Sequence, residues 1–338
     1  MSPLPVALVG AGHRAATVYA PLLLGPLSDR FRLVGIVARS DYRVPGLAQG
    51  LDLPWGLDLS DAADWGARGL ILCASAHANG PLGLQAASLG LPLLLETPLA
   101  LELPDAIRLA EALEGAPVEV AEQNPRFGDT LLWRRIVQEG WLGRVQAVAS
   151  DAAGYRYHAA SVARAILGRP HARHAVGLRT VFDEDHGPEA LYAGTLSTEG
   201  GAIYQVRDGE ALHRGAWQRG GWWLAGTGGS LRPDGVQRRD HGPLPIESRL
   251  EAGRRRWSCG PLEVVDPLPH LDADAAAVAR CLLDWLARID GRVTETAWSV
   301  DDALRDLAWC VAIERAATLG VRVSVPQLLG TCRFLGGR

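Results

Sequence analysis

A short apolar run that passes directly into a glycine-rich turn near the start of the chain constrains the fold most. Residues 6–10 read VALVG, Gly12 follows two positions later, and a helical segment opens after it. A strand, a glycine turn and a helix in this order form the first half of a βαβ unit, which pairs its strands in parallel. The chain is therefore expected to begin with an α/β domain.

Short apolar runs continue to alternate with helical patterns through the first part of the chain. Strand-like runs lie at residues 31–38, 69–74, 91–96 and 118–123. Residues 69–95 contain no charged side chain, but histidine, asparagine, glycine and proline interrupt them. Buried parallel strands joined by a crossover helix therefore explain this stretch better than a membrane span does. The alternation predicts a doubly wound parallel sheet.

The pattern changes after about residue 125, where strands no longer alternate with helices. Residues 177–232 contain several alternating apolar and polar segments separated by glycine-rich turns, which is typical of antiparallel strands. Residues 270–289 and 299–320 have apolar residues at helical spacing. We therefore expect a second α/β domain over residues 125–338, with helix 299–320 packing back near the first domain.

The composition excludes several classes of partner and location. The formal net charge is −4, so the chain lacks the basic footprint of nucleic-acid-binding proteins. Its five cysteines are scattered and form no CxxC pair, which fits reduced thiols better than a disulfide framework. The first residues read as a strand and a turn rather than as a signal peptide. We expect a cytoplasmic protein that binds neither nucleic acid nor membranes.

The glycine-rich turn has the composition of a phosphate-binding loop. Gly10 and Gly12 allow the backbone to approach a pyrophosphate, and His13 and Arg14 begin the helix whose N-terminus favours an anion. Its place at the start of a βαβ array predicts a Rossmann dinucleotide-binding domain over residues 1–124. A glycine turn that binds no nucleotide is the alternative.

The end of the second strand distinguishes the two nicotinamide dinucleotides. An acidic residue there binds the ribose 2′-hydroxyl of NAD, whereas an arginine accommodates the 2′-phosphate of NADP. The chain places Arg39 and Ser40 at this point. NADP is therefore the favoured cofactor and NAD remains possible. In a chain whose 34 basic residues are all arginine, Arg39 could also be an ordinary surface residue.

Five segments together resemble the Gfo/Idh/MocA oxidoreductases. They read VALVGAGHR, LLLETPLAL, AEQNPRF, WWLAGTGGSL and GVRVSVP, and the resemblance covers nearly the whole chain. It implies an N-terminal Rossmann domain followed by an α/β domain with an open, largely antiparallel sheet. It further implies NAD(P)-dependent oxidation or reduction of sugars, cyclitols and related polyols, and a homodimer or homotetramer formed through that sheet.

The family's Glu-Lys-Pro hallmark is replaced here by Glu96-Thr97-Pro98. In the family the lysine contacts the substrate hydroxyl and helps to move its proton, and the bond before the proline is often cis. The chain has no lysine at any position. A threonine hydroxyl can donate and accept a hydrogen bond, but it cannot take up a proton near neutral pH. We therefore assign Thr97 to the catalytic site with a hydrogen-bonding role only.

The second family motif carries two acids and a histidine ahead of a helix. His158 stands at the position of the histidine, while Gly154 and Ser161 replace the acids. His158 is thus the conventional acid–base group left at the matching positions, and imidazole exchanges protons near neutral pH. We expect His158 to transfer the proton, with Tyr157 as a hydrogen-bonding neighbour. A structural histidine and a packed tyrosine are the alternatives.

The glycine turn and the family motifs together define the remaining expected site residues. Those assigned to the cofactor are Gly10, Gly12, His13, Arg14, Arg39, Ser40, Ser75, His77, Glu96, Pro98 and Asn124, and those assigned to the substrate are Arg126, Tyr155 and Ser161. A metal site is not expected, because His158, His171 and His174 lack helical spacing and an accompanying carboxylate.

The sequence favours an NAD(P)-dependent oxidoreductase with atypical proton-transfer residues, acting on a sugar-like or other small hydroxyl or carbonyl substrate. One alternative is a redox-inactive nucleotide-binding sensor or accessory protein, and another is a lyase or hydrolase that retains the cofactor. Loss of the lysine and the acids supports the sensor or accessory protein, whereas the glycine turn and Glu96 support nucleotide binding.

Overall fold

The computed structural model describes residues 2–38, 44–152, 156–184, 187–209 and 221–336. The chain forms two compact units, Met1–Gln123 with Leu271–Leu304, and Asn124–His270 with Arg305–Arg338. The second unit begins next to the boundary expected near residue 124. Leu271–Leu304 groups with the first unit, although the sequence pattern suggested the second domain for it.

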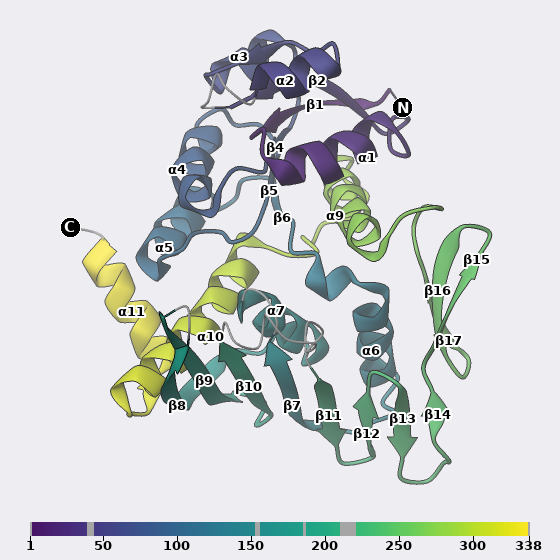
Figure 1. Cartoon of the computed structure of the whole chain (residues 1–338), viewed down its shortest axis with the longest axis vertical. Helices are drawn as coiled ribbons and strands as arrows, with labels where there is room; N and C mark the ends of the chain where they lie inside the picture. The colour runs from purple at the N-terminus through teal and green to yellow at the C-terminus, as the bar shows by residue number, and fades with distance from the viewer. Residues whose placement is uncertain (1, 39–43, 153–155, 185–186, 210–220, 337–338) are drawn as a thin grey trace. The chain divides into compact units, whose positions relative to one another are not determined.

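The first unit contains a six-stranded parallel sheet with the order β3-β2-β1-β4-β5-β6 (Figure 1). Its strands are β1 (Leu4–Val9), β2 (Phe31–Val37), β3 (Trp55–Gly56), β4 (Leu70–Leu72), β5 (Leu93–Leu95) and β6 (Val118–Val120). The central strands are almost completely buried, because helices cover both faces of such a sheet. The predicted doubly wound parallel sheet is confirmed.

Helices of the first unit connect these strands and add one late segment. They are η1 (Ala15–Tyr19), α1 (Ala20–Leu24), α2 (Val44–Gly50), α3 (Ser60–Asp64), α4 (Ala76–Ala87), α5 (Leu103–Ala112) and α9 (Ala273–Ile289). Trp285 explains why α9 belongs here, since its buried ring stacks on Phe31 of β2 with 6.1 Å between the centroids. Asp272 caps α9 by accepting a hydrogen bond from the N–H of Ala275 at 2.8 Å.

The second unit contains a nine-stranded sheet with the order β14-β13-β12-β11-β7-β10-β9-β8-β18 (Figure 1). Its strands are β7 (Val145–Ala152), β8 (Ala172–Glu184), β9 (Gly187–Thr198), β10 (Ile203–Gly209), β11 (Trp222–Gly226), β12 (Gly229–Arg232), β13 (Gly235–Arg238), β14 (Leu244–Pro245) and β18 (Val323–Ser324). The neighbours β7 and β10 are parallel, and the other pairs are antiparallel. The expected mostly antiparallel sheet is therefore confirmed.

Among the described residues, the second unit also contains a three-stranded antiparallel sheet and several helical segments. They are β15 (Glu247–Glu251), β16 (Arg254–Cys259), β17 (Leu262–Val265), η2 (Asn124–Arg126), α6 (Gly128–Gln138), α7 (Arg156–Ile166), α10 (Val300–Leu319) and α11 (Val325–Gly336). The division between the units falls inside α10, after Leu304.

Helices α7 and α10 cover one face of the nine-stranded sheet. The ring of Tyr204 on β10 lies 5.6 Å from that of Trp309 on α10, and a Cβ added to Gly194 of β9 would lie 2.2 Å from Ile313. Buried Arg164 of α7 pairs with buried Asp306 of α10 at 2.6 Å. The helices therefore pack tightly on this face, and among the described residues the opposite face stays open.

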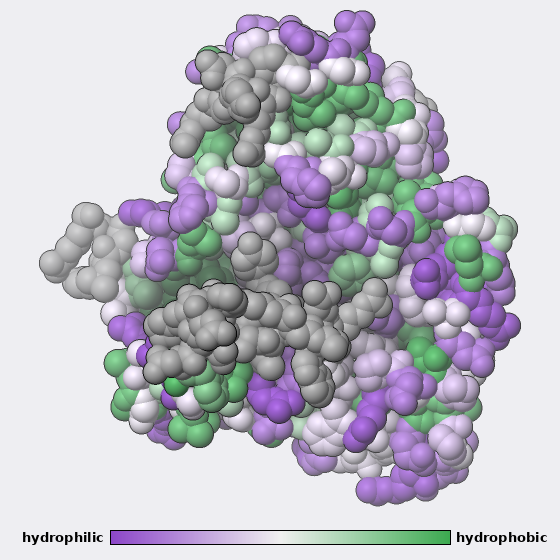
Figure 2. All heavy atoms as spheres, viewed as in Figure 1, coloured by the Kyte–Doolittle hydropathy of each residue, from purple (hydrophilic) through white to green (hydrophobic). Residues whose placement is uncertain are grey.

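Polar and apolar residues are interspersed over the face of the molecule that Figure 2 shows. Among the described residues, the longest helices are too polar or too short to cross a bilayer.

Candidate functional site

A cleft of about 520 Å³ lies in the first unit, at the carboxyl ends of β1, β2 and β4. Its lining begins with the glycine turn, residues 9–14, and continues with residues 37–38, 57–59, 73–75, Ala78, Leu82 and Gln85. Open α/β sheets bind ligands at this edge. Gly10, Gly12, His13, Arg14 and Ser75 of the predicted cofactor set all line the cleft.

Gly10 and Gly12 of the turn differ in what a larger side chain would contact. Gly10 has φ 121°, and a Cβ there would lie 2.5 Å from the carbonyl oxygen of Cys73 at the end of β4. A Cβ added to Gly12 would meet no heavy atom within 4 Å. Gly10 therefore lets the turn approach β4, while Gly12 keeps the floor of the cleft free of side-chain atoms.

Arg14 lines the cleft, but its guanidinium is bonded to other side chains of the first unit. Its Nε donates to Glu96 in a short ion pair, its Nη1 pairs with Asp274 at 3.1 Å, and its Nη2 donates to Gln123 at 2.6 Å. Burial alone would lower the pKa of Arg14, but the charge of Glu96 and the other acids outweighs burial and raises it. Arg14 thus stays charged and links β5, the end of β6 and α9.

The carboxylate of Glu96 is the buried centre of this network. Its side chain is 6 % exposed, and its Oε1 accepts from both Arg14 and the hydroxyl of Tyr19, the latter at 2.8 Å. Its Oε2 accepts from the N–H of Thr97 at 3.0 Å. Burial, and then the charge of Glu96, raise the pKa of Tyr19 well above its ordinary value. Glu96 therefore fixes the turn that follows β5, and it lies outside the cleft lining.

Replacing Arg14 by glutamine is expected to lower the free energy of unfolding by about 2–3 kcal/mol, because Glu96 loses its cation while staying buried. Urea denaturation followed by tryptophan fluorescence measures this loss. Arg108→Gln is the matched control, since its pair with Asp105 is about half exposed and is worth less than about 1 kcal/mol. Equal losses in the two variants would contradict a structural role for the Arg14 network.

The Thr97–Pro98 peptide bond is cis, as the resemblance implied. Asn79 on α4 also stabilises this turn, because its fully buried amide donates to the carbonyl oxygens of Glu96 at 3.0 Å and Pro98 at 3.2 Å. Thr97 is half-buried. The turn is thus held on both sides, by Glu96 through its side chain and by Asn79 through hydrogen bonds to the backbone.

The predicted residues of the second unit lie on η2 and on the first turns of α7. Arg126 is buried on η2, next to Asn124. The rings of Tyr157 and His158 lie 4.2 Å apart on α7, and Ser161 is buried with its hydroxyl donating to the carbonyl of His158 at 2.8 Å. Ser161 therefore bonds within its own helix. The predictions for Arg39, Ser40 and Tyr155 fall outside the described residues.

His77 and Pro98, two further residues of the predicted cofactor set, lie outside the cleft lining. His77 is exposed on the first turn of α4. Among the described ranges, no three histidine, cysteine or acidic side chains gather as metal ligands would. His171, one of the three histidines considered for a metal, instead lies 2.6 Å from a guanidinium nitrogen of Arg305.

Arg156, which the sequence did not single out, anchors the start of α7. It pairs with Asp208 at 2.5 Å and Glu314 at 2.9 Å, and its guanidinium lies 4.8 Å from the ring centroid of Tyr192. Burial alone would lower the pKa of Arg156, but the charges of Asp208 and Glu314 raise it. These partners come from β9, β10 and α10, so no local signal in the sequence could have revealed the cluster.

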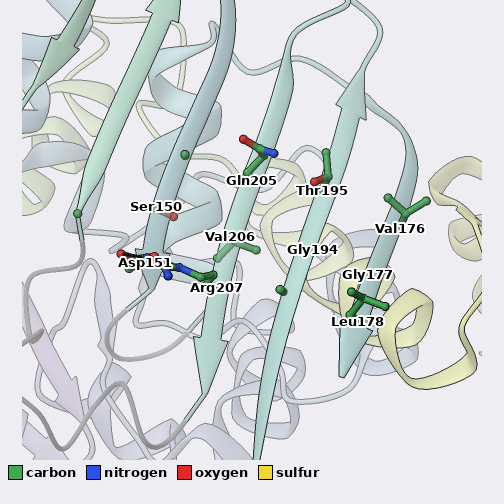
Figure 3. A pocket seen from close by; sticks show the side chains of 13 residues that line it. Ser150, Asp151, Val176, Gly177, Leu178, Gly194, Thr195, Gln205, Val206 and Arg207 are labelled. Atoms are coloured by element: carbon green, nitrogen blue, oxygen red, sulfur yellow. Dashed lines mark hydrogen bonds and ion pairs between the residues drawn. The ribbon is translucent and has the colours of Figure 1, made fainter. Parts of the chain in front are cut away.

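The open face of the nine-stranded sheet carries a second, shallower hollow of about 650 Å³ (Figure 3). Arg207 and Asp151 form an ion pair in it, with nitrogen–oxygen distances of 2.6 and 2.8 Å. Val176 and Leu178 on β8 line it as well, and the Leu178 side chain is 75 % exposed. Exposed apolar patches rimmed by polar residues mark sites of protein–protein interaction.

Comparisons with known proteins agree with this architecture at the level of the fold. No protein-family model and no curated protein matches the chain. An oxidoreductase from Thermotoga maritima has a TM-score of 0.74 at 16% identity, over 96% of this chain and 99% of that one. An oxidoreductase from Agrobacterium radiobacter in complex with NAD+, L-tartaric acid and magnesium has a TM-score of 0.73 at 19% identity, with the same coverage.

A third similar structure is a myo-inositol 2-dehydrogenase from Lactobacillus plantarum, with a TM-score of 0.72 at 16% identity over 95% of this chain and 99% of that one. All three matches extend over both units of the chain. The chain therefore has the fold of these oxidoreductases, and the α/β fold that the resemblance implied is confirmed.

Proposed function

We propose that the chain is an NAD(P)-dependent oxidoreductase that acts on a sugar-like or other small hydroxyl or carbonyl substrate. The observation that carries the proposal is the cleft of the first unit, where the glycine turn meets the carboxyl ends of the parallel strands. NAD+ in the Agrobacterium radiobacter structure and the activity named for the Lactobacillus plantarum protein support the same reading.

The residues of the cleft fit a dinucleotide. Gly12 leaves room for a phosphate, the backbone behind it opens helix η1, and Leu57 and Leu82 supply apolar walls. When bound, the nicotinamide group supplies or accepts a hydride. We propose NADP as the favoured cofactor on the basis of Arg39 and Ser40, with NAD as the alternative.

Proton transfer is assigned to the second unit. We assign His158 as the group that exchanges a proton with the substrate oxygen, and Tyr157, whose ring lies beside it, as a hydrogen-bonding neighbour. Thr97 can hold a substrate hydroxyl but cannot act as a base. Reduction of a carbonyl makes the lighter demand on the protein, because water can also provide that proton.

Nicotinamide absorbance, followed with NADH and NADPH against a panel of aldehydes and ketoses and with the oxidised cofactors against polyols, tests the proposed turnover. A substrate-dependent change with at least one member of each class supports the oxidoreductase. Cofactor binding without any turnover over a broad panel would instead indicate the nucleotide-binding sensor.

We further propose that the chain forms a homodimer or homotetramer through the open face of the nine-stranded sheet. Leu178→Asp is expected to shift the protein to the monomer, because it places a charge in an apolar strand face. Light scattering coupled to size-exclusion chromatography measures the mass. Leu250→Asp is the matched control, since Leu250 is 69 % exposed on β15, outside this sheet. A Leu178→Asp protein with the wild-type mass would remove the face from consideration.

A cytoplasmic location is part of the same proposal. Its support is that all five cysteines are free thiols, four of them buried, which suits a reducing compartment.

A further inference from the structure

The glycine-rich turn carries two adjacent basic side chains that differ in what they bond. Each of the three nitrogens of Arg14 has a partner, namely Glu96, Asp274 or Gln123. Breaking these contacts to reach a ligand would leave Glu96 buried without its cation, which is costly. The guanidinium of Arg14 is therefore held in place and is not available to a phosphate.

His13 is in the opposite situation. Its side chain is exposed and lines the cleft, and its carbonyl oxygen accepts a hydrogen bond from the hydroxyl of Thr17 at 2.8 Å. Within the described part of the chain, its imidazole has no hydrogen bond, ion pair or ring contact. The imidazole is thus free to turn toward a ligand that lies against the glycine turn.

The other charged or titratable side chains of the lining do not compete for this role. Asp58 accepts from the N–H of Ser60 at 2.9 Å and from its hydroxyl at 2.8 Å, and these bonds lower the pKa of Asp58. Burial raises the pKa of Cys73, so its thiol stays neutral. Arg14 is matched by its acids. Among the described residues of the lining, His13 is therefore the side chain that can add an uncompensated positive charge.

We propose that His13, rather than Arg14, makes the side-chain contact to the diphosphate of the bound dinucleotide. The inference rests on the proposed function, since it concerns the cofactor of the same cleft. Backbone N–H groups of the turn and the helix N-terminus hold the anion in either protonation state. A protonated imidazole adds one charge-assisted hydrogen bond, so dinucleotide affinity falls when the imidazole loses its proton.

The experiment measures the binding of NADH and NADPH to the full chain by fluorescence titration, at about pH 6 and about pH 8.5. His13→Asn keeps a hydrogen-bonding group of similar size but removes the charge, and it is expected to weaken binding about tenfold at the lower pH only. His13→Arg is expected to bind equally well at both values. Because the side chain is exposed, neither variant should change the melting temperature.

His241→Asn is the matched control, since His241 is an exposed histidine of the second unit. Phosphorus NMR distinguishes a direct contact from a purely structural role of His13. We expect the diphosphate resonances of the bound dinucleotide to shift with pH in the wild type and not in His13→Asn.

Two results would overturn the inference, and they can be told apart. Tight binding by His13→Asn with the wild-type pH dependence removes His13 while leaving the proposed cofactor intact. Absence of NADH and NADPH binding to the wild-type chain removes the proposed function itself, and the inference with it. The contact is supported if His13→Asn binds the dinucleotide weakly with no pH dependence and His13→Arg binds it tightly with no pH dependence.

Discussion

Replacing Gly10 by alanine is expected to abolish dinucleotide binding and to lower the free energy of unfolding by about 2–4 kcal/mol. Gly10 has φ 121°, which side chains other than glycine rarely adopt, and the new methyl group would lie 2.5 Å from the carbonyl oxygen of Cys73. The obstacle is the backbone of β4 rather than the end of a flexible side chain. The turn or the strand must therefore move, and the phosphate-binding geometry moves with it.

Two further substitutions separate the effect on binding from the effect on folding. Gly12→Ala meets no heavy atom within 4 Å, so we expect an unchanged melting temperature but weaker binding, because the methyl group takes space in the cleft. Gly46→Ala on α2 also meets open space and should leave both properties unchanged. Thermal unfolding and NADH fluorescence measure the three variants side by side. A Gly10→Ala protein that is as stable and binds as tightly as the wild type would be incompatible with the described turn.

Replacing His158 by alanine is expected to lower kcat by about 10²-fold or more, because a positioned general acid–base group contributes about 10²–10⁴-fold. Cofactor binding should be unaffected, since His158 belongs to the second unit and the cleft to the first. Steady-state kinetics with the best substrate of the panel, measured across the pH range, give both kcat and the shape of the profile.

Two comparisons distinguish loss of proton transfer from the effect of the space that the missing ring leaves. His158→Gln retains a hydrogen-bonding side chain but cannot exchange a proton, so it should be as slow as the alanine variant. His241→Ala removes an exposed imidazole elsewhere in the second unit and should be as fast as the wild type. Unchanged kcat in His158→Ala would remove His158 as the proton-transfer group and leave water as the donor.

Local patterns predicted the fold of the first unit well. The apolar run, the glycine turn and the following helix lie next to one another in the sequence, and the structure places them in β1, the cleft and η1. Helical spacing also identified α9, but spacing does not reveal which sheet a helix packs on. The stacking of Trp285 on Phe31 decides that, and the two residues are far apart in the chain.

The connections within the site could not be predicted for the same reason. Arg14 was expected to bind the cofactor, because its place in the turn is visible and its partners are not. Those partners are Glu96, Gln123 and Asp274, which come from three other segments of the first unit. Asn79 on α4 is a second example, because its hydrogen bonds reach the Glu96–Pro98 turn, which belongs to another segment of the chain.

The most direct test of the proposed cofactor cleft is equilibrium binding of NADH and NADPH to the purified full chain, followed by nicotinamide fluorescence and thermal shift. The cleft predicts saturable binding of at least one of them, a higher melting temperature with the ligand, and loss of both effects in Gly10→Ala. If neither dinucleotide binds to the folded wild-type protein, the chain has the fold of these oxidoreductases without their cofactor, and the proposed function is wrong.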